Sequence, residues 1–175
     1  MDAHLELPPS PWVQRWIGLI RPGGAVLDVA CGSGRHARLL ASLGFEVDAV
    51  DRQPALFAHP PRGVVLLGAD IEDGPWPYAG RRFDGIVVTN YLHRTLLPTL
   101  VDSLEPGGIL LYETFARGNE RFGKPSNPAF LLAPGELLEM VRGRLQVVAY
   151  EDLVVDHPRP AAVQRVCARQ ERVAS

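Results

Sequence analysis

Cysteine is scarce in this chain, with two residues among 175. Cys31 and Cys167 lie far apart in the sequence, and their spacing is not that of metal ligands. We therefore expect neither a disulfide framework nor a metal site. Two isolated thiols of this kind are typical of a reduced, cytoplasmic protein.

Long apolar runs are also missing. No stretch approaches the ~20 apolar residues that a membrane-spanning helix needs. The N-terminus reads MDAHLELPPSPW and contains neither the basic region nor the apolar run of a signal peptide. These absences predict a cytoplasmic protein without a membrane partner.

Neither sign of charge dominates, because 18 basic and 20 acidic residues leave a net charge of −2. No global field therefore attracts the protein to nucleic acid or to anionic membranes. Hydrophobic residues make up 46% of the chain and charged residues 22%, which is the composition of a folded globular protein. The length predicts a single domain, residues 1–175.

Helix and strand signals alternate along most of the chain. In the N-terminal segment 1–24, Ser10 and Pro11 predict the start of a helix that turns Leu19 inward. Apolar, β-branched runs predict strands at 25–31, 45–51, 64–70, 83–91 and 109–115. Helical signals follow at 35–43 (with Leu43 inward), 53–59, 96–104 (with Thr95 as its cap) and 134–143.

The last two strand-like runs, 145–156 and 161–171, are joined only by HPRP. Because this connection is too short for a crossover helix, the two strands are predicted to be antiparallel. The whole pattern predicts an α/β fold with a doubly wound, seven-stranded, mostly parallel sheet and an antiparallel last strand. Ligands of such sheets bind at the carboxyl ends of the strands.

The first strand leads into the sequence VLDVACGSGRH. Gly32 and Gly34 allow a backbone to approach a ligand closely, and the helix that begins near Arg35 directs free N–H groups at an anion. Asp28 is unusual, because a carboxylate ends an otherwise apolar strand. Steric need explains the glycines of this turn, but it does not explain the acid.

Two further acids end the next two strands. Asp51 follows Gly32 by 19 residues, close to the ~20 expected of a carboxylate that binds ribose hydroxyls. Asp70 ends the third strand, where a carboxylate can accept a hydrogen bond from an adenine amine. Each acid alone is also compatible with a capped turn, but three acids at three consecutive strand ends favour a nucleoside site.

The charge of Asp28 distinguishes between two nucleoside cofactors. A nicotinamide dinucleotide would place a pyrophosphate on the glycine turn, and Asp28 would repel it. The glycine-rich sequence fingerprint of dinucleotide-binding folds has a third glycine, and Ala37 stands at that position here. S-adenosylmethionine carries an ammonium, a carboxylate and a positive sulfur but no phosphate, so its zwitterion suits an acid beside an anion-binding turn.

The chain resembles the class I S-adenosylmethionine-dependent methyltransferases over nearly its whole length. The similarity is carried by VLDVACGSGR (26–35), VDAVD (47–51), GAD (68–70), FDGIVVTNYLH (83–93) and LEPGGILLYETF (104–115). Ala30 stands where this family frequently has glycine. Within the family, the chain is most similar to the small tellurite-resistance-type methyltransferases.

This resemblance implies a Rossmann-like methyltransferase fold and S-adenosylmethionine as the cofactor. Arg52 and Ile71 would flank the adenosine, and Asn90 would contribute its backbone. Carried over position by position, the cofactor contacts are Asp28, Ala30, Cys31, Gly32, Gly34, Asp51, Arg52, Asp70, Ile71 and Asn90.

Tyr91 and His93 follow the fourth strand, toward which the methyl group of the cofactor is expected to point. We predict that His93 is a general base, since its ordinary pKa lies near neutrality, and that Tyr91 lines the methyl-transfer pocket. A helix-capping or solvent-facing histidine is the alternative. Asn90 is followed by Tyr-Leu-His rather than by the Pro-Pro-aromatic run of enzymes that methylate amino groups of nucleic acids.

Residues 116–133 form the longest irregular stretch, which we expect to cover the acceptor site; a solvated basic loop is the alternative. The chain has no added domain and no basic face, so we predict a methyltransferase for a small-molecule acceptor. One alternative is an RNA-modifying methyltransferase, in which arginines of 117–124 cluster with Arg142 and Arg144. Another is a non-catalytic, S-adenosylmethionine-binding partner subunit.

Overall fold

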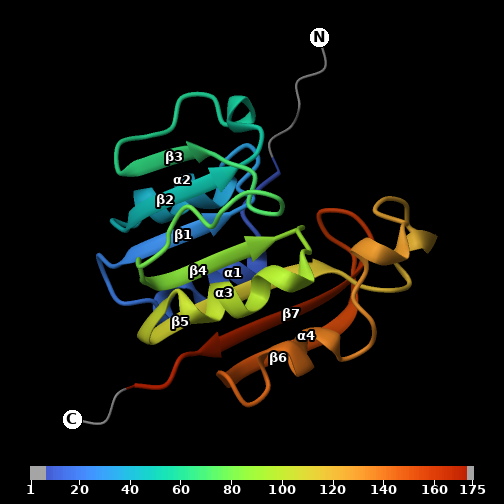
Figure 1. The fold of residues 1–175 in the computed structure, drawn as a ribbon. Coiled ribbons are helices and arrows are strands. Elements are labelled where there is room, and N and C mark those ends of the chain that lie inside the picture. The colour runs from blue at the N-terminus through green and yellow to red at the C-terminus, as the bar shows by residue number, and fades with distance from the viewer. Residues whose placement is uncertain (1–6, 173–175) are drawn as a thin grey trace.

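The computed structural model describes residues 7–172, and Figure 1 shows a twisted sheet with helices on both faces. The predictions for residues 1–6 and 173–175 lie outside the described residues. The strands are β1 (Ala25–Val29), β2 (Glu46–Asp51), β3 (Val64–Gly68), β4 (Phe83–Thr89), β5 (Leu104–Phe115), β6 (Gln146–Val155) and β7 (Ala161–Arg169). The α-helices are α1 (Pro11–Trp16), α2 (Arg35–Ser42), α3 (Leu97–Asp102) and α4 (Glu136–Val141).

The seven strands form one sheet in the order β3-β2-β1-β4-β5-β7-β6. Neighbours from β3 to β5 pair in parallel, whereas β7 is antiparallel to both β5 and β6. The predicted doubly wound sheet with an antiparallel last strand is therefore confirmed. The reason is the short connection between β6 and β7, which can only reverse the chain.

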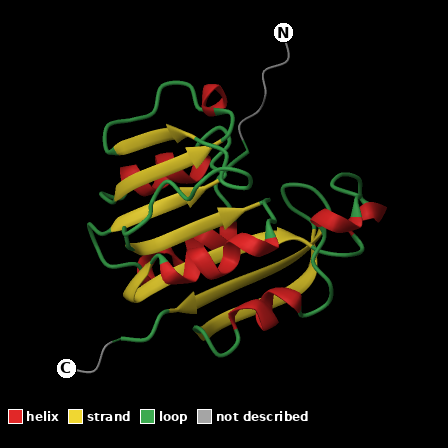
Figure 2. Cartoon of the chain, in the orientation of Figure 1, coloured by secondary structure: helices red, strands yellow, loops and turns green. Residues whose placement is uncertain are grey.

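Two apolar clusters cover the two faces of the sheet, and Figure 2 shows helices on each side of it. One cluster lies under α1 and α2, and the other lies under α3 and α4. Successive residues of β1 alternate between them, since Val26 belongs to the first cluster and Leu27 and Val29 belong to the second. Burial on both faces explains why the central strands read as continuous apolar runs.

The N-terminal helix begins at the predicted cap. The Ser10 hydroxyl accepts a hydrogen bond from the Trp12 N–H (3.1 Å). A 3₁₀ turn at Ile17–Leu19 then replaces the α-helix and rotates the inward face. Ile17 is buried in consequence and Leu19 is 38% exposed, so the prediction that Leu19 faces inward is wrong.

Two further helix predictions are wrong in detail. Leu43 is 52% exposed, because His36 and Ala37 occupy the buried face of α2. Thr95 does not cap α3, since a 3₁₀ turn at Arg94–Leu96 precedes that helix and no side chain caps either element.

Between residues 7 and 172, no three His, Cys, Asp or Glu side chains gather in a way that could hold a metal ion. Over the same residues, no helix is both long and apolar enough to cross a bilayer.

Candidate active site

The candidate site lies at the carboxyl ends of β1 and β4. The strand order reverses between them, because β2 and β3 lie on one side of β1 while β4 and β5 lie on the other (Figure 1). Ala30 and Asn90 follow these strands directly, and their φ angles are 52° and 54°. Two non-glycine residues in the left-handed region at the switch point of the sheet are typical of a ligand site.

Asp51 organises the glycine-rich loop after β1. The Gly32 N–H donates to Asp51 Oδ2 (2.9 Å), and the Cys31 N–H donates to the Val50 carbonyl (3.0 Å). Gly32 has a φ of +53°, and a Cβ added to it would meet no atom within 4 Å. Gly32 therefore borders open space, where a side chain would occupy the room of a ligand.

Gly34 is required for a different reason. Its φ is +86°, and an added Cβ would lie 2.3–2.5 Å from three atoms of the Phe57 ring. Phe57 is 2% exposed, and the guanidinium of Arg38 lies over its ring at 4.8 Å. Gly34 thus permits the packing of Phe57 under the loop, and the structure places no ligand-facing surface at this glycine.

Three adjoining cavities surround the loop, and we name each after one residue or loop in its wall. The Asp70 cavity, of about 220 Å³, is lined by Ala30, Asp51, Arg52, Gln53, Ala69, Asp70, Ile71, Glu72 and Tyr91. The glycine-loop cavity, of about 620 Å³, is lined by Leu7, Ala30, Cys31, Gly32, Ser33, Arg35, His36, Leu56, Thr89 and Asn90.

The Glu113 cavity, of about 190 Å³, is lined by residues 7–11, Arg35, Asn90, Glu113, Phe115, Val155, 157–159, Ala161, Val163 and Arg165. Ala30 borders both the Asp70 cavity and the glycine-loop cavity. Leu7, Arg35 and Asn90 border both the glycine-loop cavity and the Glu113 cavity. The three cavities therefore form a continuous trough across the ends of the strands.

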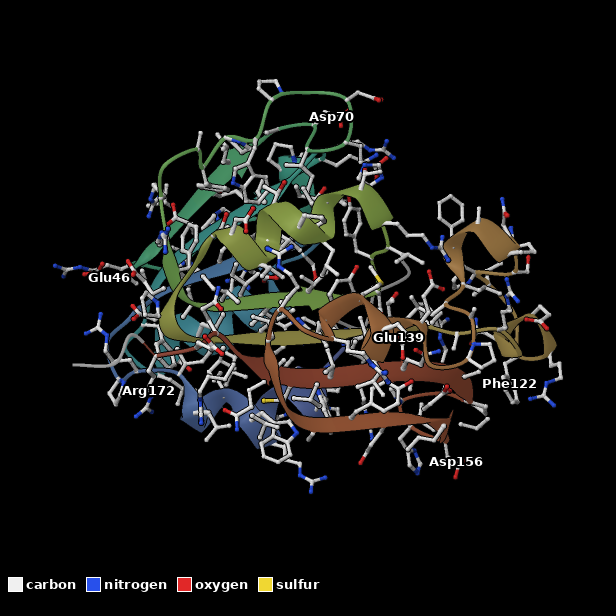
Figure 3. The ribbon with its side chains drawn as sticks, turned by 60° about the horizontal axis from the view of Figure 1, so that its bottom comes forward. Glu46, Asp70, Phe122, Glu139, Asp156 and Arg172 are labelled. Atoms are coloured by element: carbon white, nitrogen blue, oxygen red, sulfur yellow. The ribbon has the colours of Figure 1, made fainter. Side chains whose placement is uncertain are left out.

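The Asp70 cavity presents two carboxylates with free acceptor capacity. Asp70 Oδ1 accepts from the backbone N–H groups of Glu72 (2.9 Å) and Asp73 (3.1 Å), and these bonds hold the pKa of Asp70 below its usual value. Asp51 Oδ1 accepts from the Gln53 N–H (2.8 Å). Asp70 Oδ2 remains open on the exposed loop after β3, which Figure 3 labels. Two fixed carboxylates suit a ligand that donates from hydroxyl and amino groups.

Asp28 does not line any of the three cavities. It is 1% exposed, and its Oδ2 has no hydrogen-bond partner among the described residues. Burial raises the pKa of Asp28 to about 7. The direct contact of Asp28 with the cofactor stays a prediction, and a buried carboxylate of this kind would favour a cationic ligand through its charge.

The two predicted catalytic residues lie away from the junction of the cavities. Tyr91 lines the Asp70 cavity, and its hydroxyl donates to Glu72 Oε1 (3.0 Å). Burial together with Glu72 raises the pKa of Tyr91. His93 lines none of the three cavities, and its Nε2 lies 2.7 Å from Thr95 Oγ1. This placement favours a loop-stabilising role for His93 and a nucleoside-side role for Tyr91.

His36 is a site residue that the sequence analysis missed. It is 2% exposed, its Nε2 accepts a hydrogen bond from the Ser10 N–H (2.9 Å), and its Nδ1 lies 3.3 Å from Thr89 Oγ1. Burial lowers the pKa of His36 to about 3. The ring is therefore neutral, and because Nε2 accepts, Nδ1 carries the proton and donates to Thr89. The sequence signal that could have identified His36 is a polar residue on the apolar, buried face of the helix that follows the glycine-rich loop.

Glu113 joins the N-terminal segment to the end of β5. Its Oε1 accepts from the Ser10 hydroxyl (2.6 Å), and its Oε2 accepts from the Arg165 guanidinium (3.1 Å). Arg165 also pairs with Glu151 and lies over the Trp12 ring at 5.0 Å. Ser10 is thus fixed by both His36 and Glu113, which holds residues 7–11 against the trough.

Known sequences resemble this chain over the region that contains the site. A family model for a methyltransferase domain matches residues 26–108, which begin in β1 and end within β5. A protein-L-isoaspartate O-methyltransferase from Chlorobaculum tepidum is 38% identical over 96 residues, which cover 51% of this chain and 44% of the relative. The chain is similar to methyltransferase domains from β1 into β5. It spans about half the length of the curated relatives that it matches, including one from Gloeobacter violaceus that is 36% identical over 119 residues.

Several solved structures share the fold. TehB from Haemophilus influenzae superposes with a TM-score of 0.75 at 19% identity, covering 91% of this chain and 61% of the other. The N-methyltransferase NodS from Bradyrhizobium japonicum gives a TM-score of 0.67 at 17% identity, covering 94% and 99%. At sequence identities below 20%, these structures show that the fold is shared and do not indicate a shared substrate.

The residues of the trough fit the cofactor of this methyltransferase family, S-adenosylmethionine. The open space above Gly32 matches a ligand that contacts the loop backbone. The fixed carboxylates of Asp51 and Asp70 match a nucleoside with hydroxyl and amino donors. The unpartnered Oδ2 of Asp28 matches a cationic group above the loop. The adenosine of this cofactor would suit the Asp70 cavity, and its methionine end would suit the glycine-loop cavity.

Proposed function

We propose that this protein transfers a methyl group from S-adenosylmethionine to a small-molecule acceptor bound in the Glu113 cavity. The observation that supports this proposal most directly is the shared border of the two cavities at Arg35 and Asn90. An acceptor in the Glu113 cavity would lie beside the methionine end of the cofactor. Most of that cavity's wall is apolar, with prolines 8, 9 and 11, Phe115, Val155 and Val163.

S-adenosylmethionine, when bound, supplies a methyl group activated by a positive sulfur. Asp51 and Asp70 would hold the adenosine, and Gly32 and Asn90 would contact the methionine end through their backbones. Residues 7–11, tied down by Ser10, would exclude water from the acceptor. Positioning of this kind can lower a barrier by ~7–11 kcal/mol without a dedicated acid or base.

Both carboxylate oxygens of Glu113 already accept hydrogen bonds, so we assign Glu113 a positioning role. We expect Ser10→Ala to raise the KM for an acceptor more than it lowers kcat. A lost base would instead lower kcat and change its pH profile.

The first test is calorimetric titration with S-adenosylhomocysteine, followed by transfer of labelled methyl groups to a panel of small molecules. Binding in the micromolar range and methylation of a panel member are expected. The absence of any heat from S-adenosylmethionine and S-adenosylhomocysteine would refute the proposal. Binding without transfer to any member would instead favour the non-catalytic partner subunit.

Methylation of protein L-isoaspartate is the second candidate, because the relatives from Chlorobaculum tepidum and Gloeobacter violaceus carry that name. A peptide with one isoaspartyl residue and its aspartyl isomer separate the two candidates. We expect neither peptide to be methylated. Transfer to the isoaspartyl peptide alone would replace the small-molecule proposal.

The RNA alternative loses much of its basic surface in the structure. Arg142 pairs with Glu139 (2.9 Å) and Arg144 pairs with Asp102 (2.6 Å). These two arginines are therefore largely neutralised, and they do not add to a cationic surface with residues 117–124. We expect binding of single-stranded RNA to be weak at physiological salt.

A further inference from the structure

A fourth cavity extends the trough away from the cofactor. It has a volume of about 110 Å³ and is lined by Phe115, Asn119, Phe122, Gly123, Lys124, Arg159, Pro160 and Ala161. Phe115, Arg159 and Ala161 also line the Glu113 cavity. A single path therefore leads from Asn90 to the region between residues 116–124 and the turn from β6 to β7. Figure 1 shows these two segments beside each other, beyond the carboxyl ends of the parallel strands.

The long loop is anchored along this path rather than detached from it. Asn119 is 2% exposed, its side-chain Nδ2 donates to the Pro125 carbonyl (3.0 Å), and its Oδ1 accepts from the Ala162 N–H (3.2 Å). The Ala116 N–H donates to the Ala162 carbonyl (2.9 Å). These bonds tie Ala116 and Asn119 to β7, and Asn119 in turn holds Pro125, which is next to Lys124 in the wall of the fourth cavity.

The path changes character along its length. Its inner part, next to Asn90, is mainly apolar, with Phe115, Val155 and Val163. Its outer part has two cations, Arg159 and Lys124, and Lys124 is the single lysine of the chain. Phe122 also borders this outer part, and Figure 3 shows it at the same end of the molecule as Asp156, which precedes the β6–β7 turn.

Among the described residues, the two outer cations have no partner, in contrast to the two arginines of the inner part. Arg35 donates a hydrogen bond to the Pro8 carbonyl (2.8 Å). Arg165 is paired with Glu113 and Glu151. Within residues 7–172, Arg159 and Lys124 form no ion pair, and their side chains make no hydrogen bond. Two cations at one end of an apolar path are complementary to a ligand with an apolar body and an anionic end.

We propose that the methyl acceptor carries a terminal anionic group, held by Arg159 and Lys124, on an apolar body that lies along Phe115 and Val163. This inference rests on the proposed function, because it assumes that the path beyond Asn90 receives the acceptor. The nucleophilic atom lies at the other end of the acceptor, toward the glycine-loop cavity. Arg159 and Lys124 are specificity-determining residues in this proposal and take no part in the chemical step.

The test uses ω-phenylalkanoic acids, from benzoic acid to 5-phenylvaleric acid, each compared with its primary amide. Binding is measured by calorimetry in saturating S-adenosylhomocysteine, which fills the cofactor cavities and prevents the acids from binding there. At least one acid is expected to bind about tenfold more tightly than its amide, which corresponds to about 1.4 kcal/mol. The ratio should fall as sodium chloride rises from 50 to 300 mM.

The double variant Arg159→Gln, Lys124→Gln should bring the acid-to-amide ratio to within about twofold of one. Arg62→Gln is the matched control, since Arg62 is an exposed arginine outside all the cavities named above, and it should leave the ratio unchanged. Equal binding of acids and amides, a preference that survives the double variant, or no binding of any probe would overturn the proposal. If the double variant does not fold, the salt dependence of the wild-type ratio decides, and a flat ratio overturns it.

The outcomes separate this inference from the proposed function. Heat from S-adenosylhomocysteine with an acid-to-amide ratio near one would leave the methyltransferase proposal intact and remove the anionic acceptor. No heat from S-adenosylhomocysteine, with an acid preference measured in its absence that the double variant abolishes, would refute the methyltransferase proposal. It would leave Arg159 and Lys124 only as a binding site for an anionic ligand.

Discussion

The replacement of Gly34 by alanine tests how the glycine-rich loop is built. Gly34 has a φ of +86°, and a new Cβ would lie 2.3–2.5 Å from three atoms of the Phe57 ring. An alanine in the left-handed region costs about 1–2 kcal/mol. Overpacking against a fixed ring costs about 1–3 kcal/mol more. We therefore expect Gly34→Ala to lower the free energy of unfolding by about 2–5 kcal/mol.

Gly44→Ala is a close control for the backbone cost alone. Gly44 has a φ of +87°, and a Cβ added there would meet no atom within 4 Å. Its destabilisation should be about 1–2 kcal/mol. The difference between the two variants measures the clash with Phe57.

Urea unfolding followed by circular dichroism gives these free energies, provided that the m-values agree among the variants. In a Phe57→Leu background, which lacks the ring atoms that the new Cβ would meet, Gly34→Ala should cost no more than Gly44→Ala. Equal destabilisation by the two alanines in the wild-type background would refute the reasoning. Gly34 would then be required only for its backbone angle or for a ligand.

Four further predictions concern groups around the same loop. Gly32→Ala should destabilise the fold no more than Gly44→Ala does, yet weaken S-adenosylhomocysteine binding at least tenfold in calorimetry, because its Cβ enters open ligand space. His36 has a pKa lowered to about 3 against 6.5 in the unfolded chain, so it makes the free energy of unfolding decrease as pH falls below about 6.5, and His36→Gln should flatten that part of the pH profile. Asp28 has a pKa raised to about 7, so its contribution to stability is lost as pH rises from about 4 through 7; Asp28→Asn should be the more stable protein at pH 8, and should abolish proton release on S-adenosylhomocysteine binding at pH 6, measured in buffers of different ionisation enthalpy. Burial and nearby carboxylates raise the pKa of Cys31 to about 12, so iodoacetamide should label it at pH 8 only after unfolding, as read by mass spectrometry.

Local patterns were sufficient to predict the strands of this protein. The strands are apolar runs bounded by glycine, proline or a polar turn. In β1, β2, β4, β5 and β7, burial on both faces leaves no competing helical periodicity. The antiparallel pairing of β7 with β6 could be predicted from the short HPRP connection between these strands. The positions of Asp51 and Asp70 at the ends of β2 and β3 also followed, because parallel strands bring their carboxyl ends to one edge.

Side-chain orientation was harder to predict where helices are short. Leu19 and Leu43 were expected to face inward from helical spacing, but a 3₁₀ turn and a helix end rotate them to the surface. His93 was a reasonable base by its place in the chain, and the bond between its Nε2 and Thr95 became visible only in three dimensions.

The sequence by itself determined the order of the elements, the parallel sheet and the acids at its ligand-binding edge, because each depends on patterns within a few residues. Only the tertiary structure decided which residues line the Glu113 cavity and the cavities beside it. Ser10 meets Glu113 across 103 residues, and His36 receives the Ser10 N–H across 26. Phe57 packs against Gly34, and Lys124 comes to line one cavity with Arg159. These contacts depend on how segments that are distant in the sequence pack together, and local residue spacing does not encode that packing.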